Sequence, residues 1–366
     1  MGEGQRLERE TLARLLQAED VTQVCFDRLL RYFREEEELD RFLPDGLYRI
    51  DPRNGDRIVF NASRARRPHD NRPAEVERAA GRACIVCEGQ TTGIVDVAEL
   101  GEGFTFINKN LYPVIYPSPP EEGADVVGLH LLQWTSSLHD RDWHNLPLED
   151  RVVVLERLAA LERTLLEKGA EAFPGAATNP TGSPVFVSII KNAGHLVGGS
   201  LTHGHQQILL SNVAPRRIVD DWRFEQERGE SFAAYMLREN PETLLVRDYG
   251  PARLLVPYFM RRPYDLFLIV QETERRYLHD LSPAETTAVA RGWHDALRAF
   301  RALLPELGRE LAYNVVTHNG PGAGLYFEFL PYTQEMGGYE HLGLFISQGD
   351  PEEVAGRLRA YLDGHD

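Results

Sequence analysis

His203, His205 and Gln207 stand at every second position near the middle of the chain. If residues 202–210 form a strand, the two-residue side-chain period places two imidazoles and an amide on one face. A glycine pair at 198–199 has no side chains to block a ligand, so the backbone there could approach a phosphate and offer its N–H groups. This stretch could therefore perform nucleotide chemistry. A strand with two polar histidines facing solvent is the alternative, and a bare H-x-H pair by itself favours it.

The densest basic cluster of the chain could supply a counter-charge for phosphate. Arg64, Arg66 and Arg67 fall within four positions of an otherwise acidic protein. Guanidinium groups hold phosphate oxygens through paired hydrogen bonds. A solvated loop is an equally good interpretation of this cluster on its own.

Cys84 and Cys87 form a C-x-x-C pair, the spacing that tetrahedral zinc sites use, but they provide only half of the ligands that such a site needs. His139 and His203 are the candidate partners. A redox dithiol is the alternative, although no thioredoxin-like β-α-β pattern follows the pair. We therefore predict one structural zinc that ties the first strands of the fold to the central one.

The composition restricts the kinds of protein that this chain can be. Its 366 residues are 42% apolar, with no apolar run long enough to span a bilayer, so we expect no membrane contact. The formal charge of −16 would repel nucleic acid. The first ten residues are polar and charged, without an export signal, and only three cysteines occur. We expect a cytoplasmic protein whose phosphate ligands are small.

The order of predicted elements repeats along the chain. Residues 126–210 predict a strand, a long helix, a strand, a glycine loop and another strand, and residues 265–330 predict the same order. In the second copy, a capping box at Ser282 and Glu285 marks the start of the helix. Where the first copy has its paired histidines, the second has Tyr326 and Glu328, so the chemistry is expected in the first copy.

These patterns predict an α+β fold of two modules, each with an antiparallel sheet flanked by helices. Apolar residues at helical intervals in 8–42 indicate an additional amphipathic element, for packing or for dimer formation. An Asn-Gly turn within 49–60 predicts a hairpin. We divide the chain into an N-terminal helical extension at 1–44, a first module at 45–215 and a second module at 216–366.

Six motifs follow one another in an order that resembles the galactose-1-phosphate uridylyltransferase family, the branch of the histidine-triad superfamily with duplicated modules. The resemblance covers roughly residues 45–360, and the two modules are then histidine-triad-like. The motifs are Arg64-Ala65-Arg66-Arg67-Pro68, Cys84-x-x-Cys87, Asn110-Leu111-Tyr112-Pro113, Lys191-Asn192, Ser200-x-x-His203-x-His205-x-Gln207 and Gly338-Tyr339-Glu340.

The resemblance implies a role for each matching residue. His205 matches the nucleophile that attacks the α-phosphorus of a nucleoside diphosphate sugar, and Gln207 matches the amide that binds an oxygen of that phosphorus. The zinc ligands would be Cys84, Cys87, His139 and His203. The residues that match phosphate, nucleotide or sugar contacts are Arg64, Arg67, Asn110, Asn192, Ser200, Tyr339 and Glu340. The last two reach the hexose from the neighbouring subunit in the family, which implies a homodimer.

The chain also departs from the family. Gly204 replaces the proline that often separates the two histidines, and the histidines of a second metal site are missing around Tyr326 and Glu328, so we predict no iron. Residues 341–346 are apolar where some members have a sugar-contacting glutamine.

Three functions remain. The first is transfer of a nucleoside monophosphate, UMP above all, between a nucleoside diphosphate sugar and a sugar 1-phosphate through nucleotidyl-His205. The second is phosphorolysis of a nucleoside diphosphate sugar or a dinucleotide by the same histidine. The third is non-catalytic binding of nucleotides or sugar phosphates, which would not need the nucleophile.

Overall fold

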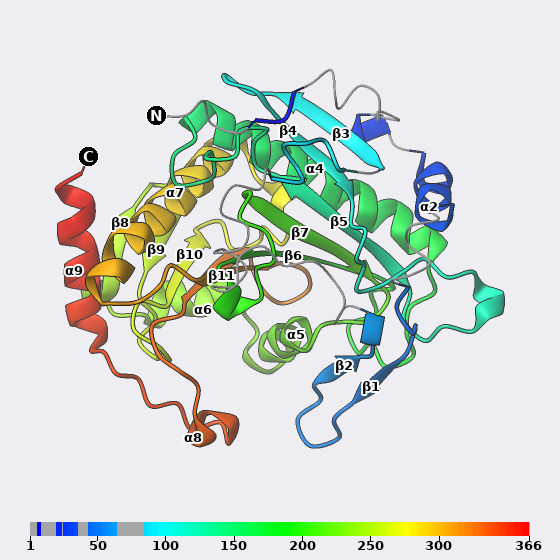
Figure 1. The fold of residues 1–366 in the computed structure, drawn as a ribbon. Helices are drawn as coiled ribbons and strands as arrows, with labels where there is room; N and C mark the ends of the chain where they lie inside the picture. Colours follow the sequence, from blue (N-terminus) through cyan, green and yellow to red (C-terminus); the bar gives the residue numbers. More distant parts are fainter. Residues whose placement is uncertain are drawn as a thin grey trace.

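The computed structural model describes residues 6–8, 20–23, 25–35, 43–63, 84–91 and 93–365. Its dominant feature is one antiparallel sheet of ten strands, in the spatial order β3-β4-β5-β7-β6-β11-β12-β10-β9-β8 (Figure 1). The strands of one half are β3 (Ile94–Glu99), β4 (Phe104–Lys109), β5 (Gly128–Trp134), β6 (Phe186–Ala193) and β7 (His205–Ser211). Those of the other half are β8 (Leu245–Asp248), β9 (Ala252–Leu255), β10 (Leu266–Val270), β11 (Tyr313–His318) and β12 (Tyr326–Pro331).

The two halves of the sheet repeat one strand order in opposite directions. Counted inward from each edge, β3, β4, β5, β7 and β6 correspond to β8, β9, β10, β12 and β11. The halves meet where β6 pairs with β11, with Lys191 opposite Val315. The α+β class is confirmed, and the strand order is the one that a duplicated module would have. The division of the chain at residue 215 stays a prediction, because one sheet runs through both halves.

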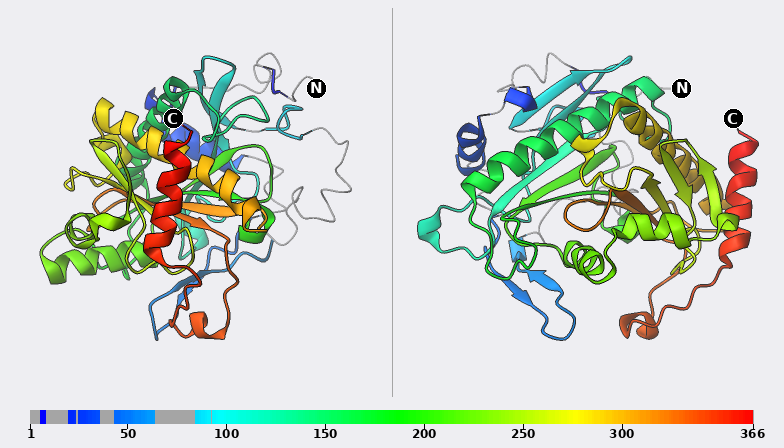
Figure 2. Two further views of the ribbon diagram at one scale, coloured as in Figure 1. Left: turned by 90° about the vertical axis from the view of Figure 1, so that its left-hand side faces the viewer. Right: turned by 180° about the vertical axis from the view of Figure 1, so that it is seen from behind.

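Two long helices, α4 (Leu148–Ala172) and α7 (Pro283–Glu306), lie side by side on one face of the sheet (Figure 2, right). Both are amphipathic, with apolar residues every three or four positions. On α4 the buried side chains are Leu155, Leu158, Leu161 and Leu165. The predicted capping box starts α7: Ser282 N–H donates to Glu285 Oε2 (2.6 Å) and Glu285 N–H to Ser282 Oγ (3.4 Å). The rings of Trp143 and of Trp293 on α7 contact each other at a tilt of 42°, with centroids 4.6 Å apart, and this contact joins the two halves.

Shorter helices complete the molecule. They are α5 (Arg216–Arg228), α6 (Phe232–Glu239), α8 (Gly338–His341) and α9 (Pro351–Asp363). The last of these packs against β8, the edge strand of the second half, and so covers a sheet edge. None of the described helices is long and apolar enough to cross a bilayer.

The described part of the N-terminal extension packs on the first half of its own chain. The helix α2 (Phe26–Arg34) buries Phe26, Leu29, Leu30 and Phe33 in the main core. The side chain of Arg157 on α4 binds Asp96 Oδ2 through Nε (2.8 Å) and Asp20 Oδ1 through NH2 (2.7 Å). These contacts make α2 a packing element, while much of the predicted helical stretch, residues 9–19, 24 and 36–42, lies outside the described residues.

The predicted hairpin is confirmed by β1 (Tyr48–Ile50) and β2 (Arg57–Val59), which pair antiparallel. Its turn contains Gly55 with φ of +79°, a conformation that glycine adopts without strain.

Candidate active site

The strand that carries the paired histidines begins later than predicted. β7 starts at His205, not at residue 202, and His203 belongs to the turn before it. As a result the two imidazoles do not share a face. The ring of His203 turns toward the two cysteines, whereas His205 and Gln207 line a pocket.

A cluster of four candidate metal ligands forms around His203. One ligand atom each from Cys84, Cys87, His139 and His203 lies within 4.8 Å of the others. His203 Nδ1 is 3.7 Å from Cys84 Sγ and 3.6 Å from Cys87 Sγ, and His139 Nδ1 is 3.8 Å from Cys87 Sγ. His203 Nε2–H donates to Ser136 O (2.7 Å), which turns Nδ1 toward the thiols. Two sulfurs and two ring nitrogens form a donor set that can hold a tetrahedral metal ion.

His205 is held as a neutral imidazole. Its Nδ1–H donates to the carbonyl of His203 (2.8 Å), so Nε2 keeps its lone pair. Burial lowers the pKa of His205 to about 4 and outweighs that hydrogen bond, which acts in the opposite direction. The ring of Trp134 lies 4.9 Å from that of His205, and its Nε1–H donates to Asn108 Oδ1 (2.9 Å). The site thus presents an unprotonated, oriented ring nitrogen near pH 7.

The amide of Gln207 is oriented by His130, a residue that the sequence analysis did not select. His130 Nδ1 accepts a hydrogen bond from Val114 N–H (3.0 Å), so the ring proton resides on Nε2 and donates to Gln207 Oε1 (3.2 Å). Because Oε1 is engaged, the NH₂ group of Gln207 remains as the donor for the pocket. His130 reaches Gln207 because β5 pairs with β7 in a register that places Leu132, two residues from His130, opposite Gln207. The sequence alone does not show this register.

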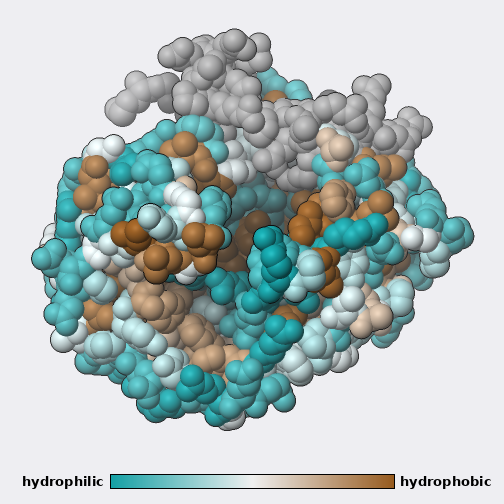
Figure 3. Space-filling model, turned by 90° about the horizontal axis from the view of Figure 1, so that it is seen from below, coloured by the Kyte–Doolittle hydropathy of each residue, from teal (hydrophilic) through white to brown (hydrophobic). Residues whose placement is uncertain are grey.

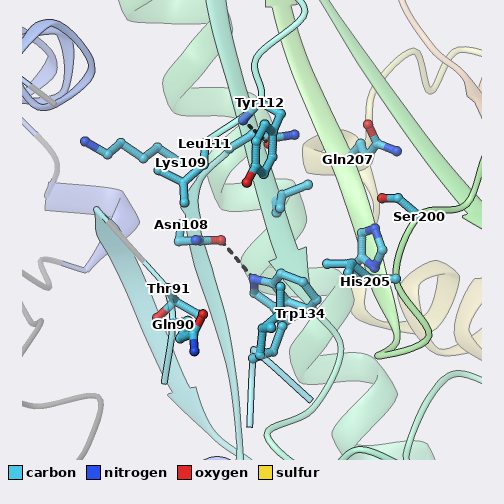
Figure 4. A pocket seen from close by; sticks show the side chains of 15 residues that line it. Gln90, Thr91, Asn108, Lys109, Leu111, Tyr112, Trp134, Ser200, His205 and Gln207 are labelled. Atoms are coloured by element: carbon cyan, nitrogen blue, oxygen red, sulfur yellow. Dashed lines mark hydrogen bonds between the residues drawn. The ribbon is translucent and has the colours of Figure 1, made fainter. Parts of the chain in front are cut away.

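The pocket lies between β4, β5, β7 and the segments that precede β3 and β7. Figure 4 shows Ser200, His205 and Gln207 along one side, with Tyr112 and Asn108 across from them. Asn110 also lines it, where its side chain accepts a hydrogen bond from Tyr112 N–H (2.8 Å). Leu111, Leu132 and Val86 supply apolar walls, and Lys109 supplies the fixed positive charge of the described lining. Apolar walls with a few directed polar groups are typical of a nucleotide pocket.

Other predicted site residues lie elsewhere. Asn192, at the β6–β11 seam, accepts a hydrogen bond from Asn314 Nδ2 (2.7 Å) and does not line the pocket. Tyr339 and Glu340 stand on α8, also outside the pocket lining. Arg64 and Arg67 lie outside the described residues.

The glycine pair at 198–199 does not have the free N–H groups for a phosphate that the sequence predicted. The N–H groups of Gly198 and Gly199 donate to His195 O (3.3 Å) and Gly194 O (3.0 Å), within their own loop. They therefore serve the loop instead of being offered to a ligand.

An ion pair that is largely buried supports the backbone of His205. Lys191 Nζ lies 2.8 Å from Asp142 Oδ2 and donates to His205 O (3.2 Å), and Lys191 is only 2% exposed. A Cβ atom at Gly204 would lie 2.6 Å from Asp142 Cγ. Any residue with a Cβ atom would therefore be too close to this carboxylate, which explains why the chain has glycine where proline is common in the family. In the sequence, Lys191 could have been noticed as a lysine near the end of an apolar strand. Nothing in the sequence distinguished Asp142.

In the second half, the histidine on the neighbouring strands has a raised pKa, in contrast to the lowered pKa of His205. Tyr326 and Glu328 occupy β12, and His318 lies between two carboxylates, 3.0 Å from Glu328 Oε2 and 3.6 Å from Asp221 Oδ2. Burial alone would lower the pKa of His318, but the two carboxylates raise it to about 9. A charged imidazole between two acids is neither a nucleophile nor a metal ligand, so the chemistry belongs to the first half.

Comparison with solved structures shows which proteins share this fold. A solved uridylyltransferase is 23% identical, covers 87% of this chain and 98% of its own, and superposes with a TM-score of 0.66. An ADP-glucose phosphorylase from Arabidopsis thaliana, solved with bound ADP-glucose, is 17% identical, covers 86% and 98%, and has a TM-score of 0.61. The chain therefore has the fold of the two-module nucleotidyltransferases.

Comparison of sequences finds the same resemblance. The galactose-1-phosphate uridylyltransferase of Cryptococcus neoformans var. neoformans serotype D is 24% identical over 350 residues, which span 86% of this chain and 90% of that protein. No model of a known protein family matches the chain. The predicted resemblance to the galactose-1-phosphate uridylyltransferase family is confirmed, and it supports a nucleotidyltransferase enzyme.

The Lys191–Asp142 pair leads to a stability prediction. We expect Lys191→Met to lower the free energy of unfolding by about 3–5 kcal/mol, because it leaves a buried carboxylate without its partner. Urea denaturation measures this change. The exposed pair of Lys168 and Glu171, 3.6 Å apart, provides the control. Lys168→Met should change stability by less than about 0.5 kcal/mol.

The double variant Lys191→Met/Asp142→Leu should regain much of that stability, since no buried charge remains. It should still transfer nucleotides slowly, because the carbonyl of His205 has lost its donor. Equal stabilities of Lys191→Met and Lys168→Met would contradict the proposed support.

Proposed function

We propose that this chain transfers a nucleoside monophosphate, UMP in our proposal, from a nucleoside diphosphate sugar to a sugar 1-phosphate through a covalent nucleotidyl-His205. The observation that carries the proposal is a neutral, buried His205, whose Nε2 forms no hydrogen bond with any described residue, next to the amide of Gln207, which lines the same pocket. A binding protein needs neither feature.

The reaction takes place in two displacements. First, the lone pair of His205 Nε2 attacks the α-phosphorus, the P–N bond forms, and the bond from that phosphorus to the bridging oxygen breaks, which releases the sugar 1-phosphate. Second, a phosphate oxygen of the acceptor attacks the same phosphorus, and the P–N bond breaks to restore neutral His205. The NH₂ of Gln207 holds a non-bridging oxygen throughout, where negative charge is concentrated.

The pocket lining supports a nucleotide as the group that is carried. Leu111, Leu132 and Val86 would face the base, and Asn110 and Ser200 would bind polar groups of the nucleotide. Arg64 and Arg67 would hold the departing or entering phosphate, as the family resemblance implies. The acceptor is either a sugar phosphate or inorganic phosphate. The second choice rests on residues 341–346, which are apolar where some family members contact the sugar.

We expect mass spectrometry to detect a nucleoside monophosphate on the peptide that contains His205, after the enzyme is mixed with a nucleoside diphosphate sugar and no acceptor. His205→Gly should form no adduct and show no turnover. Gln207→Ala should slow both half-reactions by about 10²-fold, the scale for losing a preorganised donor to a charged oxygen. His195→Gly is the matched control, since His195 lies outside the pocket and binds Glu310 (3.0 Å).

Normal turnover by His205→Gly, or turnover without any adduct, would rule out the double displacement. Supplying sugar 1-phosphates and inorganic phosphate to the preformed adduct then separates a transferase from a phosphorylase. Absence of both adduct and turnover with all donors would favour a protein that only binds nucleotides.

We also propose that Cys84, Cys87, His139 and His203 hold one structural zinc ion. Zinc suits two thiolates and two imidazoles, and a fully occupied shell makes the ion structural, with no position left for substrate. Thiolate ligands also agree with the reducing cytoplasm that we propose for this protein.

Elemental analysis of protein purified without chelators should find one zinc per chain. Cys84→Ser/Cys87→Ser should lose the metal and destabilise the turn at His203, whereas Cys25→Ser, a change at an exposed cysteine, should keep it. Full zinc retention in the double variant would contradict the ligand assignment.

We propose, finally, that the chain forms a homodimer. The segment 336–346, which includes α8, carries apolar side chains on the surface: Met336, Tyr339, Leu342, Leu344, Phe345 and Ile346, with Leu342 83% exposed. Figure 3 shows apolar side chains on the face of the molecule to which α8 belongs. An exposed apolar segment of this size is typical of an interaction surface, and in the family the same segment reaches the neighbouring site.

Light scattering at micromolar concentration should give the mass of two chains. Leu342→Glu/Leu344→Glu should shift the protein toward monomers, since each charge would be buried at the interface. A wild-type mass equal to 41.5 kDa, that of one chain, would contradict the dimer.

A further inference from the structure

A second pocket lies between the first turns of α4, the helix α7, the strand β8 and the C-terminal turn. In Figure 1, α7, β8 and the C-terminus lie together at the left, while β4 and β5 lie on the other side of the molecule. Four arginines line this pocket: Arg151, Arg247, Arg291 and Arg298. No aliphatic side chain is among its described lining residues, and its one tyrosine, Tyr249, donates its hydroxyl to Asp295 (2.8 Å).

The carboxylates around this pocket do not balance the arginines. Asp248 accepts a hydrogen bond from Arg253 (3.0 Å), which lies outside the pocket lining. Asp295 lies 3.7 Å from both Arg247 and Arg298. Arg247 has a second partner in Asp363, at 2.9 Å. Among the described residues, the other three pocket arginines, Arg151, Arg291 and Arg298, share the single carboxylate of Asp295, so their positive charge is in excess in a protein whose net charge is −16.

Arg151 is the residue that most favours an anion site in this pocket. It is only 7% exposed, and its guanidinium donates to two backbone carbonyls, Pro147 O (3.3 Å) and Ala290 O (3.1 Å). No carboxylate of the described residues forms an ion pair with it. A buried guanidinium without a direct ion pair is unfavourable. Burial lowers the pKa of Arg151 to about 10; the carboxylates of Asp295 and Glu149 act against this shift, and the positive charges of Arg291 and Arg298 add to it.

We propose that this pocket binds a small, multiply charged oxyanion, either free phosphate or the phosphate group of a small ester, with Arg151, Arg291 and Arg298 as its ligands. Planar guanidinium groups bind tetrahedral oxyanions through paired hydrogen bonds. The polar walls provide no surface for a base or an acyl chain. The ligand is therefore a phosphate group and not a whole nucleotide, which distinguishes this pocket from the one at His205.

The bound anion would join the two halves of the molecule. Arg151 belongs to α4 of the first half, and Arg291 and Arg298 belong to α7 of the second. His294, also on α7 and in the pocket, donates through Nδ1–H to Trp143 O (3.1 Å), the residue next to Asp142. Phosphate should therefore stabilise the contact between α4 and α7 and raise the melting temperature, since it binds the folded state alone.

Calorimetric titration of the full chain with inorganic phosphate, at constant ionic strength, tests the site. Gln207→Ala separates it from any binding in the catalytic pocket. Arg291→Glu reverses an exposed charge of the second pocket, and Arg223→Glu makes the same exchange at an exposed arginine of α5. We expect saturable binding in wild type, Gln207→Ala and Arg223→Glu, and binding weaker by about tenfold or more in Arg291→Glu, the scale for losing a hydrogen bond to a charged group.

Arg298→Gln should weaken binding as well, so that a folding defect in one variant does not decide the result. A parallel titration with glucose 1-phosphate identifies the source of the phosphate: tighter binding of the free ion or of the ester names the natural ligand, and either supports the site. The proposal is overturned if wild type shows no saturable binding, if Arg291→Glu and Arg298→Gln bind normally, or if Arg223→Glu weakens binding equally.

Discussion

The position of His205 depends on how residues 203–206 are held by the segment that follows β5. Four residues of that segment contact them: Thr135 through N–H to Gly204 O (3.0 Å), Ser136 through its carbonyl to His203 Nε2–H (2.7 Å), Asp142 through Lys191 to His205 O, and Trp143 through Nε1–H to Gln206 Oε1 (3.2 Å). Each hydrogen bond contributes only about 1 kcal/mol. Together they fix both sides of His205, and in-line attack on phosphorus needs this accuracy, since small displacements of a reacting atom slow catalysis strongly. The metal cluster adds a fifth connection, because His139 comes from the same segment.

The duplicated fold shows how one backbone can support either a reactive or an inert histidine. No carboxylate of the described residues is hydrogen-bonded to the ring of His205, so burial dominates and its pKa falls to about 4, although the charge of Asp142 acts in the opposite direction. His318 is equally buried, but Asp221 and Glu328 raise its pKa to about 9. Burial favours loss of the proton from an imidazole, whereas carboxylates next to the ring favour keeping it. The carboxylates near each ring, and not the fold, therefore decide which half of the molecule can perform nucleophilic chemistry.

What could be predicted from the sequence was local, and what could not depends on contacts between distant segments. The duplication, the capping box at Ser282 and the Cys-x-x-Cys pair are visible because periodicity and spacing within a few residues produce them. His203 and His205 were found by the same means, and the family resemblance assigned them to different sites, but the different directions of their rings were missed, since these depend on where β7 begins and on the hydrogen bond of His203 to Ser136 O in another segment. His130 and Lys191 act through strand register, which a single sequence does not reveal. The arginine pocket is less visible still, because its members come from α4, α7 and β8.

Charge explains why an acidic protein can use phosphate ligands without attracting nucleic acid. At physiological ionic strength, charges more than about 8 Å apart are largely screened, so the net charge of −16 matters little to a small anion once it is inside a pocket. An extended polyanion, in contrast, would contact the acidic surface along its whole length. Beside the pocket at His205, Asp142 compensates Lys191, and in the lining itself Lys109 donates to Tyr32 O (2.6 Å), so the described lining contains little free positive charge. Directed donors such as the amide of Gln207 must then provide most of the stabilisation there, whereas uncompensated guanidinium charge is concentrated at Arg151 and Arg291. The molecule thus separates two means of binding phosphate: oriented neutral groups where the phosphoryl group must react and leave, and fixed charges where an anion need only remain bound.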